Sequence, residues 1–244
     1  MTDGLLLLHA WPLDARMWDR QRAAIPSGVA VAAPNHPGFG GSEPAGDVLT
    51  MTAAAERALT ALDEAGIERA VVCGLSFGGY VAFELWRRAR DRVGGLVLAN
   101  TRAVGDSDEA ALARRGLADR LRSEGNVLAD EPPPLLSEDA PDDVAERVRR
   151  WIADQPAEAI AAALLGMAVR PDSTPDLSSI DVPTLVVTST DDRLIAAEIS
   201  AEMARGIPRA RLETLGGAGH LTNVEAPDAF DALLLDHLAA CGVA

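Results

Sequence analysis

The sequence contains few cysteines, no lysine and no long hydrophobic run. The two cysteines, Cys73 and Cys241, cannot form a disulfide scaffold or a four-ligand zinc site. The longest early apolar run, Leu5–Leu8, is far shorter than the roughly 20 residues that span a bilayer. No basic segment leads into an apolar stretch and a cleavage site, as it would in a secretory signal. We therefore expect a cytoplasmic protein that is not inserted in a membrane.

Basic charge is also scarce. The 22 basic side chains, all arginine, are outnumbered by 37 acidic ones, which gives a formal net charge of −15. A nucleic-acid-binding protein needs a basic surface to neutralise phosphates, and anionic membranes repel an acidic protein. With this net charge, we expect neither nucleic acid nor a membrane surface to be a partner of the protein. With 244 residues and 48% hydrophobic residues, the chain is long enough for one large folded domain, or a domain with an insertion.

Six short apolar runs alternate with segments of helical periodicity. Most of the runs are continuous, which is typical of strands covered on both faces by helices. Strands separated by helices indicate a mostly parallel sheet with right-handed crossovers. The expected strands are Gly4–His9, Val29–Pro34, Ala70–Leu75, Val93–Ala99, Val182–Thr188 and Ala210–Leu215, and the expected helices are Asp14–Ile25, Thr52–Ala65, Phe77–Arg90, Ala196–Arg205 and Pro227–Ala240.

Residues 104–180 interrupt this alternation, because they contain helical patterns at Glu109–Glu124, Asp142–Ala153 and Ala157–Val169 but no convincing strand. A structureless loop of that length is improbable in a compact domain. An insertion between two core strands can cover the ends of the strands, where open α/β sheets bind their ligands. We therefore predict a core of residues 1–103 and 181–244 and a helical lid of residues 104–180.

The pattern G-x-S-x-G occurs at Gly74, Ser76 and Gly78. An apolar strand pattern precedes it and a helical pattern follows it. A nucleophile at such a sharp strand-to-helix turn needs neighbours without side chains, and it projects above the sheet. A structural turn with a helix-capping serine is the alternative interpretation, and we consider it much the weaker.

With this turn, the chain resembles the α/β-hydrolase superfamily over nearly its whole length. Further segments that resemble landmarks of the family follow in family order: residues 6–12 (LLLHAWP), 34–42 (PNHPGFGGS), 185–192 (LVVTSTDD) and 217–225 (GAGHLTNVE). The resemblance implies the α/β-hydrolase fold, with a mostly parallel sheet of about six strands. Because only residues 1–3 precede the first expected strand, we expect the strand hairpin that usually opens this fold to be absent, and dimerisation through the edge thus exposed is one option.

The same resemblance implies a catalytic triad. Ser76 corresponds to the nucleophile and His220 to the general base, with the acid at Asp192 or its neighbour Asp191. The family's spacing favours Asp192, although Ser189 and Ala196 replace the usual glycine and proline of that motif. Of the other histidines, His9 corresponds to a family position that is usually structural, and His237 is expected at the surface. His36 lies in a glycine-rich loop, where it either borders the predicted pocket or stabilises the turn.

An oxyanion formed during acyl transfer must be met by preorganised N–H donors. The resemblance assigns these donors to the backbone N–H groups of Phe77 and Trp11, although Ala10 replaces the usual glycine of the Trp11 loop. In the predicted lid, candidates to line an acyl pocket are Trp151, Leu164, Leu165 and Met167, for which lid packing is the commoner role. Arg102 and Arg170 offer positive charge for an acidic substrate group, although arginines more often face solvent.

The resemblance implies a serine hydrolase without a metal or cofactor. It is expected to cleave a small carboxylic ester, lactone or thioester through an acyl-enzyme, similarly to enol-lactonase-like and small esterase members. The same triad also serves C–C bond hydrolysis, perhydrolysis and acyl transfer in relatives, and some relatives bind ligands without turnover. Because fold alone does not fix function, these alternatives remain open at the level of sequence.

Overall fold

A single parallel sheet forms the centre of the computed structural model, which describes residues 3–243. The six strands are β1 (Asp3–Leu8), β2 (Ala30–Ala32), β3 (Arg69–Leu75), β4 (Val93–Ala99), β5 (Thr184–Ser189) and β6 (Ala210–Leu215). They follow the order β2-β1-β3-β4-β5-β6, and every neighbouring pair is parallel. The predicted fold class is therefore confirmed. The order leaves β2 and β6 at the two edges, and dimerisation through an edge stays a prediction.

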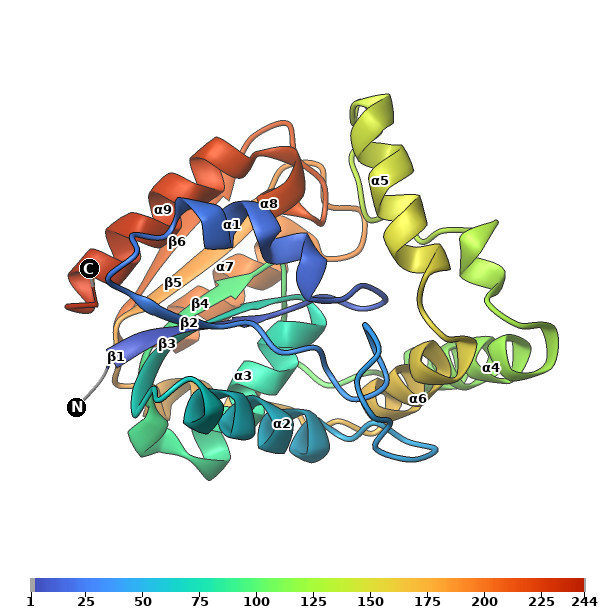
Figure 1. Ribbon diagram of the computed structural model, residues 1–244, viewed down its shortest axis with the longest axis horizontal. Helices are drawn as coiled ribbons and strands as arrows, with labels where there is room; N and C mark the ends of the chain where they lie inside the picture. Colours follow the sequence, from blue (N-terminus) through green and yellow to red (C-terminus); the bar gives the residue numbers. More distant parts are fainter. Residues whose placement is uncertain (1–2, 244) are drawn as a thin grey trace.

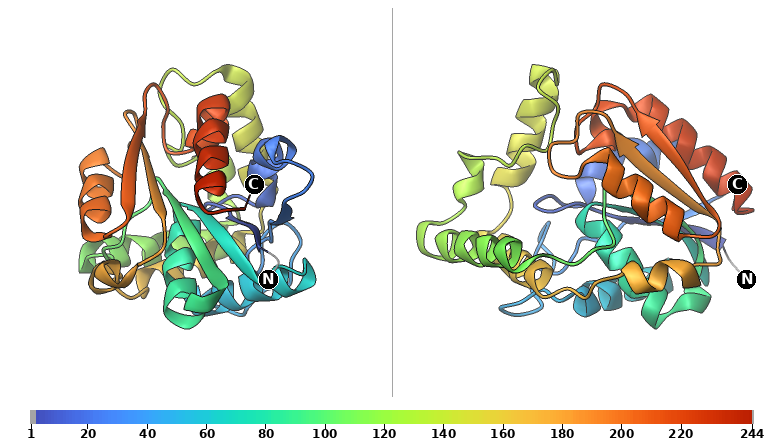
Figure 2. Two further views of the ribbon diagram at one scale, coloured as in Figure 1. Left: turned by 90° about the vertical axis from the view of Figure 1, so that its left-hand side faces the viewer. Right: turned by 180° about the vertical axis from the view of Figure 1, so that it is seen from behind.

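Helices cover both faces of the sheet. The α-helices of residues 3–243 are α1 (Asp19–Ala24), α2 (Met51–Glu64), α3 (Phe77–Arg88), α4 (Asp108–Glu124), α5 (Asp142–Ala153), α6 (Ala157–Ala168), α7 (Ala197–Gly206), α8 (Thr222–Glu225) and α9 (Pro227–Ala240). Helices α1 and α9 lie on one face, and α2 and α3 lie on the other (Figures 1 and 2). This double covering explains why the central strands are apolar on both sides: Leu5–Leu8 are fully buried. The edge strand β6 instead has only half-buried and exposed residues.

The observed element bounds differ from the predicted ones mainly near the N-terminus. The expected strand Val29–Pro34 shortens to β2, of which only three residues pair with β1. The expected helix Asp14–Ile25 divides into a 3₁₀ turn at Ala15–Trp18 and the short helix α1. Asp14 caps that turn, because its side chain accepts a hydrogen bond from the N–H of Arg16.

Between β4 and β5 the chain forms α4, α5 and α6 and, within the described residues, no strand. Helix α4 packs against α6, and the three helices lie at the end of the sheet remote from the two chain termini (Figure 1). That is the end at which β1 and β3 finish. The division into a core and a lid is not settled by this arrangement and stays a prediction. Throughout residues 3–243, every helix is too short or too polar to cross a membrane.

Candidate active site

Ser76 occupies a strained turn between β3 and α3. Its backbone has a φ of 55° and a ψ of −113°, one of two positive φ values outside glycine in residues 3–243. Its N–H donates to the Ala99 carbonyl oxygen at 2.9 Å, and its carbonyl oxygen accepts from the Thr101 hydroxyl at 2.7 Å. These bonds hold the turn against the end of β4. A backbone conformation that costs free energy persists when its surroundings fix it, and such positions cluster at functional sites.

The glycines of the G-x-S-x-G pattern allow close contact around this turn. A Cβ atom on Gly74 would lie 2.3 Å from the Gly78 carbonyl oxygen, and one on Gly78 would lie 2.1 Å from the Leu8 carbonyl oxygen. The following Gly79 has the same constraint, because its Cβ would lie 2.3 Å from the Thr101 hydroxyl. The start of α3 therefore packs directly on the end of β1, which brings the Ser76 turn next to the loop that follows β1.

His220 and Asp192 form a buried pair. The Nδ1 atom of His220 lies 2.8 Å from Oδ2 of Asp192, and both side chains are almost fully buried. Asp192, not its neighbour Asp191, makes this contact. The Asp191 side chain is exposed and accepts a hydrogen bond from Thr190. The family spacing and the geometry therefore favour the same aspartate.

Asn100 holds the Asp192 carboxylate from a second side, and sequence reasoning missed it. Its Nδ2 donates to Oδ2 of Asp192 at 2.9 Å, while the backbone N–H groups of Leu194 and Ile195 donate to Oδ1 at 2.8 and 3.0 Å. Burial raises the pKa of Asp192, but the His220 contact and these hydrogen bonds outweigh burial, so the pKa lies below its ordinary value. Asp192 is thus an anion with fixed acceptor directions. Asn100 has a positive φ of 43°, a signal visible only in the structure.

Ser76 and His220 line one small cavity of about 140 Å³. The other residues around it are Trp11, Tyr80, Arg102, Arg114, Pro133, Met167, Leu194 and Ile195. It is smaller than the roughly 300–1,000 Å³ common for drug-sized ligands. Within residues 3–243, no hydrogen bond joins the Ser76 hydroxyl to His220. Catalytic hydrogen bonds are often long in the free enzyme and tighten when substrate binds.

The two predicted N–H donors lie beside the Ser76 turn. Phe77 is the first residue of α3, where N–H groups have no partner within the helix. Trp11 lines the cavity, and its indole Nε1 donates to the Ile160 carbonyl oxygen of α6 at 3.2 Å. Trp11 therefore connects the loop after β1 to the predicted lid, and the role of its backbone N–H as an oxyanion donor stays a prediction.

Two buried histidines support that loop. The N–H of His36 donates to Nε2 of His9 at 2.9 Å, so His9 carries its proton on Nδ1, which lies 3.0 Å from the Ala10 carbonyl oxygen. Burial lowers the pKa of His9 to about 4 and that of His36 well below its ordinary value. Both rings are therefore neutral at pH 7. Their contacts fasten the loop after β1 to the segment after β2.

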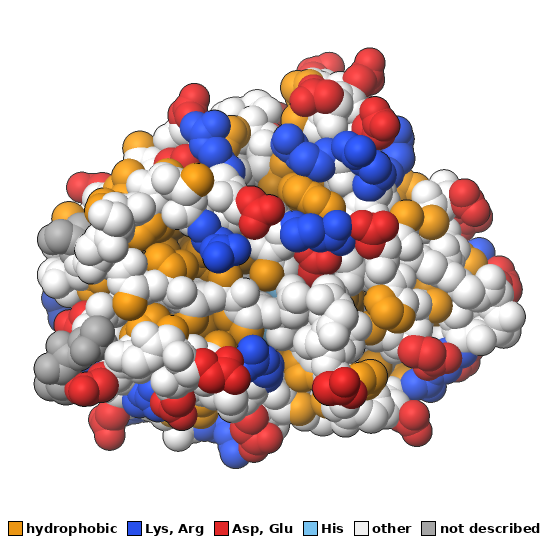
Figure 3. All heavy atoms as spheres, viewed as in Figure 1, with side chains coloured by type: hydrophobic (Ala, Val, Ile, Leu, Met, Phe, Trp, Pro, Cys, Tyr) orange, Lys and Arg blue, Asp and Glu red, His pale blue; other side chains and the backbone are white. Residues whose placement is uncertain are grey.

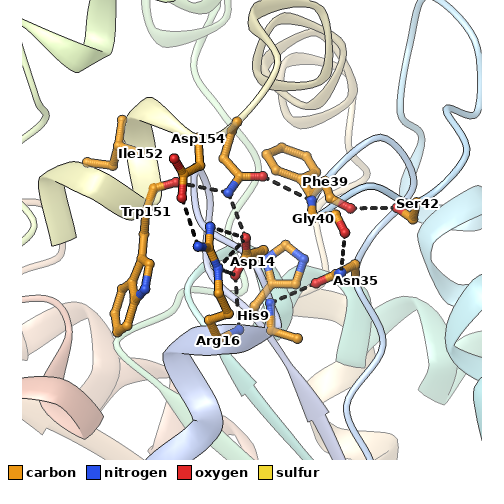
Figure 4. A network of polar contacts seen from close by, with 12 residues as sticks. His9, Asp14, Arg16, Asn35, Phe39, Gly40, Ser42, Trp151, Ile152 and Asp154 are labelled. Carbon is orange, nitrogen blue, oxygen red and sulfur yellow. Dashed lines mark hydrogen bonds and ion pairs between the residues drawn. The ribbon is translucent and has the colours of Figure 1, made fainter. Parts of the chain in front are cut away.

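A polar network extends this support to the junction of α5 and α6 (Figure 4). The guanidinium of Arg16 contacts the Asp14 carboxylate at 2.8 Å and Asp154 at 2.8 Å. Gln155 donates to Asp14 at 2.7 Å, and its Oε1 accepts from the Gly40 N–H at 3.0 Å. Three segments that are far apart in the sequence are thus connected beside the site: the loop after β1, the loop after β2 and the α5–α6 junction.

The remaining sequence candidates lie in different places. Met167 and Arg102 line the cavity, and so does Arg114, which sequence reasoning missed. Leu164 is buried in the hydrophobic core, and Leu165 packs against that core. Trp151 and Arg170 also lie outside the cavity lining. The expectation that His237 lies at the surface is wrong: α9 packs it against β4, and its side chain is 2% exposed.

Larger hollows occur elsewhere on the molecule. One of about 420 Å³ lies between α1 and α5 and is lined by Arg16, Arg20, Arg147 and Trp151, among others. Figure 3 shows basic side chains beside a hollow on this face. None of the described residues that line it is a serine or a histidine, so we place the candidate nucleophile and base in the smaller cavity. Within residues 3–243, no group of three or more histidine, cysteine, aspartate or glutamate side chains is arranged to hold a metal ion.

Comparisons with known proteins agree with this fold. The model of the "Alpha/beta hydrolase family" matches residues 5–233, and the chain belongs to that family. It is an α/β-fold hydrolase. A thermophilic esterase from Thermogutta terrifontis, solved with malate bound, is 39% identical and superposes with a TM-score of 0.93, over 99% of this chain and 92% of that chain.

Two curated relatives have other activities. The 3-oxoadipate enol-lactonase 1 of Acinetobacter baylyi is 29% identical, covering 89% of this chain and 81% of the enol-lactonase. The 2-hydroxymuconate semialdehyde hydrolase of Pseudomonas putida is 31% identical, covering 86% of this chain and 76% of that hydrolase. Relatives at similar identity thus have different substrates, which leaves the reaction of this chain to be argued from its site.

Proposed function

We propose that this protein is a serine hydrolase that cleaves a small carboxylic ester, lactone or thioester through an acyl-enzyme. The single observation that carries the proposal is the position of Ser76: it lies in a strained turn and lines the same small cavity as His220, whose other ring nitrogen contacts the buried Asp192. A serine hydroxyl needs a base to become a nucleophile, and that base needs an acid to orient it.

In the proposed reaction, Ser76 Oγ attacks the carbonyl carbon while His220 Nε2 takes the hydroxyl proton. Asp192 holds the resulting imidazolium through Nδ1. The backbone N–H groups of Phe77 and Trp11 stabilise the oxyanion. The carbon–oxygen or carbon–sulfur bond to the leaving group then breaks, and His220 returns its proton to the departing atom. Water repeats the sequence on the acyl-enzyme, which releases the acid and restores the serine.

The predicted lid has a defined place in this proposal. Met167 of α6, Arg114 of α4 and Pro133 line the cavity that contains Ser76, and this supports the division into a core of 1–103 and 181–244 and a lid of 104–180. The cavity volume favours a short acyl group. Three further expectations remain predictions: a cytoplasmic location, a small-molecule substrate as the main partner, and a homodimer formed through the open sheet edge.

A panel of p-nitrophenyl esters of graded acyl length, with lactones and acyl thioesters alongside, tests the function. We expect turnover that is fastest for short acyl groups and is abolished by Ser76→Ala. The substitution Ser123→Ala, at an exposed position on α4, is a matched control that should keep full activity. A folded wild-type protein that hydrolyses no member of the panel would contradict the proposal.

C–C bond hydrolysis is a second candidate function, because the relative from Pseudomonas putida is named as a hydrolase of 2-hydroxymuconate semialdehyde and covers most of this chain. The proposed triad serves either reaction. Parallel assays with a vinylogous 1,5-diketone and with the esters distinguish them. A kcat/KM for the diketone well above that for every ester would favour C–C hydrolysis over ester hydrolysis.

A further inference from the structure

One buried carboxylate beside the cavity is surrounded by three arginines. The carboxylate of Asp106 contacts Arg102 at 2.6 Å and Arg170 at 2.8 Å, and it also accepts from Nε of Arg114. Asp106 and Arg170 are 1% and 2% exposed, whereas Arg102 and Arg114 are 22% and 21% exposed. Two of the three arginine side chains are therefore partly accessible, whereas Arg170 is buried.

The three positive charges exceed the negative charge of Asp106. Burial raises the pKa of Asp106, but the arginines outweigh burial and keep the pKa below its ordinary value, so Asp106 is ionised. Asp172 also interacts electrostatically with Arg170, but its side chain is exposed and accepts a hydrogen bond from the Thr174 N–H. An excess of positive charge in a partly buried cluster costs free energy unless another anion balances it.

The two accessible arginines also have unused hydrogen-bond donors. Arg170 already uses most of its donors: its guanidinium donates to the carbonyl oxygens of Met167 and Val104 and lies over the Tyr80 ring at 4.1 Å, and only its Nε has no partner within residues 3–243. By contrast, Arg102 and Arg114 donate only to Asp106 among residues 3–243, and the buried Nε of Arg102 has no partner there. Both arginines line the cavity that contains Ser76 and His220.

We propose that Arg102 and Arg114 form a carboxylate-binding subsite of this cavity, so that the preferred substrate is an ester with a free carboxylate a few bonds from the scissile carbonyl. The inference rests on the proposed ester hydrolysis by Ser76. A planar guanidinium presents paired N–H groups that match the two oxygens of a carboxylate. The small cavity restricts the distance between the two groups, which favours half-esters of short dicarboxylic acids.

Matched esters test the subsite directly. Monoethyl glutarate and ethyl valerate have the same acyl chain, except that a terminal carboxylate replaces a methyl group. We expect the wild type to have a kcat/KM for monoethyl glutarate about 10- to 100-fold above that for ethyl valerate, as hydrogen bonds to a charged group imply. Diethyl glutarate, in which the charge is masked, should behave like ethyl valerate. Ethanol release reports all three reactions.

Substitutions then locate the effect. Arg102→Gln and Arg114→Gln should each lower the ratio of the two kcat/KM values by about tenfold or more. The control Arg115→Gln, at the adjacent exposed position on α4, should leave the ratio unchanged. If a variant unfolds, Arg102→Lys provides a second test, because it keeps the charge but removes the paired donors and should lower the ratio less. Equal ratios in the wild type and both glutamine variants would overturn the subsite.

Binding of glutarate, measured by titration calorimetry, separates this inference from the proposed function. If no ester is hydrolysed but glutarate binds to the wild type and at least tenfold more weakly to Arg102→Gln, the subsite stands and ester hydrolysis fails. If esters are hydrolysed without preference for the carboxylate and glutarate does not bind, the subsite fails and ester hydrolysis stands. If neither binding nor turnover occurs, both fail.

Discussion

Replacement of Asp192 by asparagine removes the charge from the proposed triad and leaves its shape nearly unchanged. The carboxylate receives four donors: His220 Nδ1, Asn100 Nδ2 and the N–H groups of Leu194 and Ile195. An asparagine offers one oxygen and one NH₂ group. If the NH₂ faces the two backbone N–H groups, two hydrogen bonds are lost, which costs about 3–6 kcal/mol because each bond to an ionised acceptor contributes about 1.5–3 kcal/mol.

The opposite rotamer of the asparagine side chain in the Asp192→Asn variant loses less free energy. Its NH₂ then faces His220 and Asn100, where the imidazole can move its proton and accept at Nδ1, so only the Asn100 contact is lost. The proton then sits on Nε2, and His220 cannot serve as a base. A tautomer error of this kind lowers kcat by about 10⁴-fold in a serine protease. We therefore expect a loss of about 10³- to 10⁴-fold in kcat, with little change in KM.

The assay is steady-state hydrolysis of p-nitrophenyl acetate, with thermal unfolding recorded on the same samples. Asp191→Asn is the matched control, and it should leave kcat nearly unchanged because the Asp191 residue is exposed and its carboxylate accepts a hydrogen bond from Thr190, not from His220. A folded Asp192→Asn variant that retains wild-type activity would refute the reasoning. So would a severe loss in Asp191→Asn, because the acid would then have been misassigned by one residue.

Three further changes test other parts of the structure. Asn100→Ala removes one hydrogen-bond donor from the Asp192 carboxylate. Steady-state kinetics should show kcat lowered by about 10- to 100-fold with KM nearly unchanged. Full activity of this variant would exclude a positioning role for Asn100. Gly79→Ala places a Cβ 2.3 Å from the Thr101 hydroxyl and should lower the free energy of unfolding, measured in urea, by about 1–3 kcal/mol. The control Gly116→Ala lies on the exposed side of α4 and should not destabilise the protein. Burial lowers the pKa of His237 from 6.5 to about 4, so its stabilising contribution is complete above about pH 6.5 and is lost as the pH falls toward 4. His237→Gln should therefore reduce the slope of unfolding free energy against pH by about 1 kcal/mol per pH unit near pH 5. An unchanged slope would show that His237 is not buried as a neutral ring.

The parallel sheet and its helices were predictable because their signals are local. Continuous apolar runs and helical periodicity gave β4, β6, α5 and α9 with the observed bounds. The strand predicted at Val29–Pro34 was longer than the observed β2, because only three residues pair with β1 and apolar composition alone does not show which residues pair.

Parts of the site could not be predicted because they depend on tertiary contacts. Asn100 follows β4 as an ordinary polar residue, and only the approach of Asp192 at 2.9 Å reveals its role. Arg114 lies in a helix rich in charged residues, where nothing in the pattern separates a cavity-lining arginine from a solvated one. His237 was misplaced for a related reason: the helical pattern of α9 does not show which face meets β4.

Labelling of Ser76 by a fluorophosphonate probe tests the central claim most directly, since only a serine activated by its surroundings reacts quickly with such a probe. Intact-mass measurement should show one probe per wild-type molecule, peptide mapping should place it on Ser76, and Ser76→Ala should remain unlabelled. A folded wild-type protein that takes up no probe, or a Ser76→Ala variant labelled as strongly as the wild type, would contradict the assignment of Ser76 as the nucleophile.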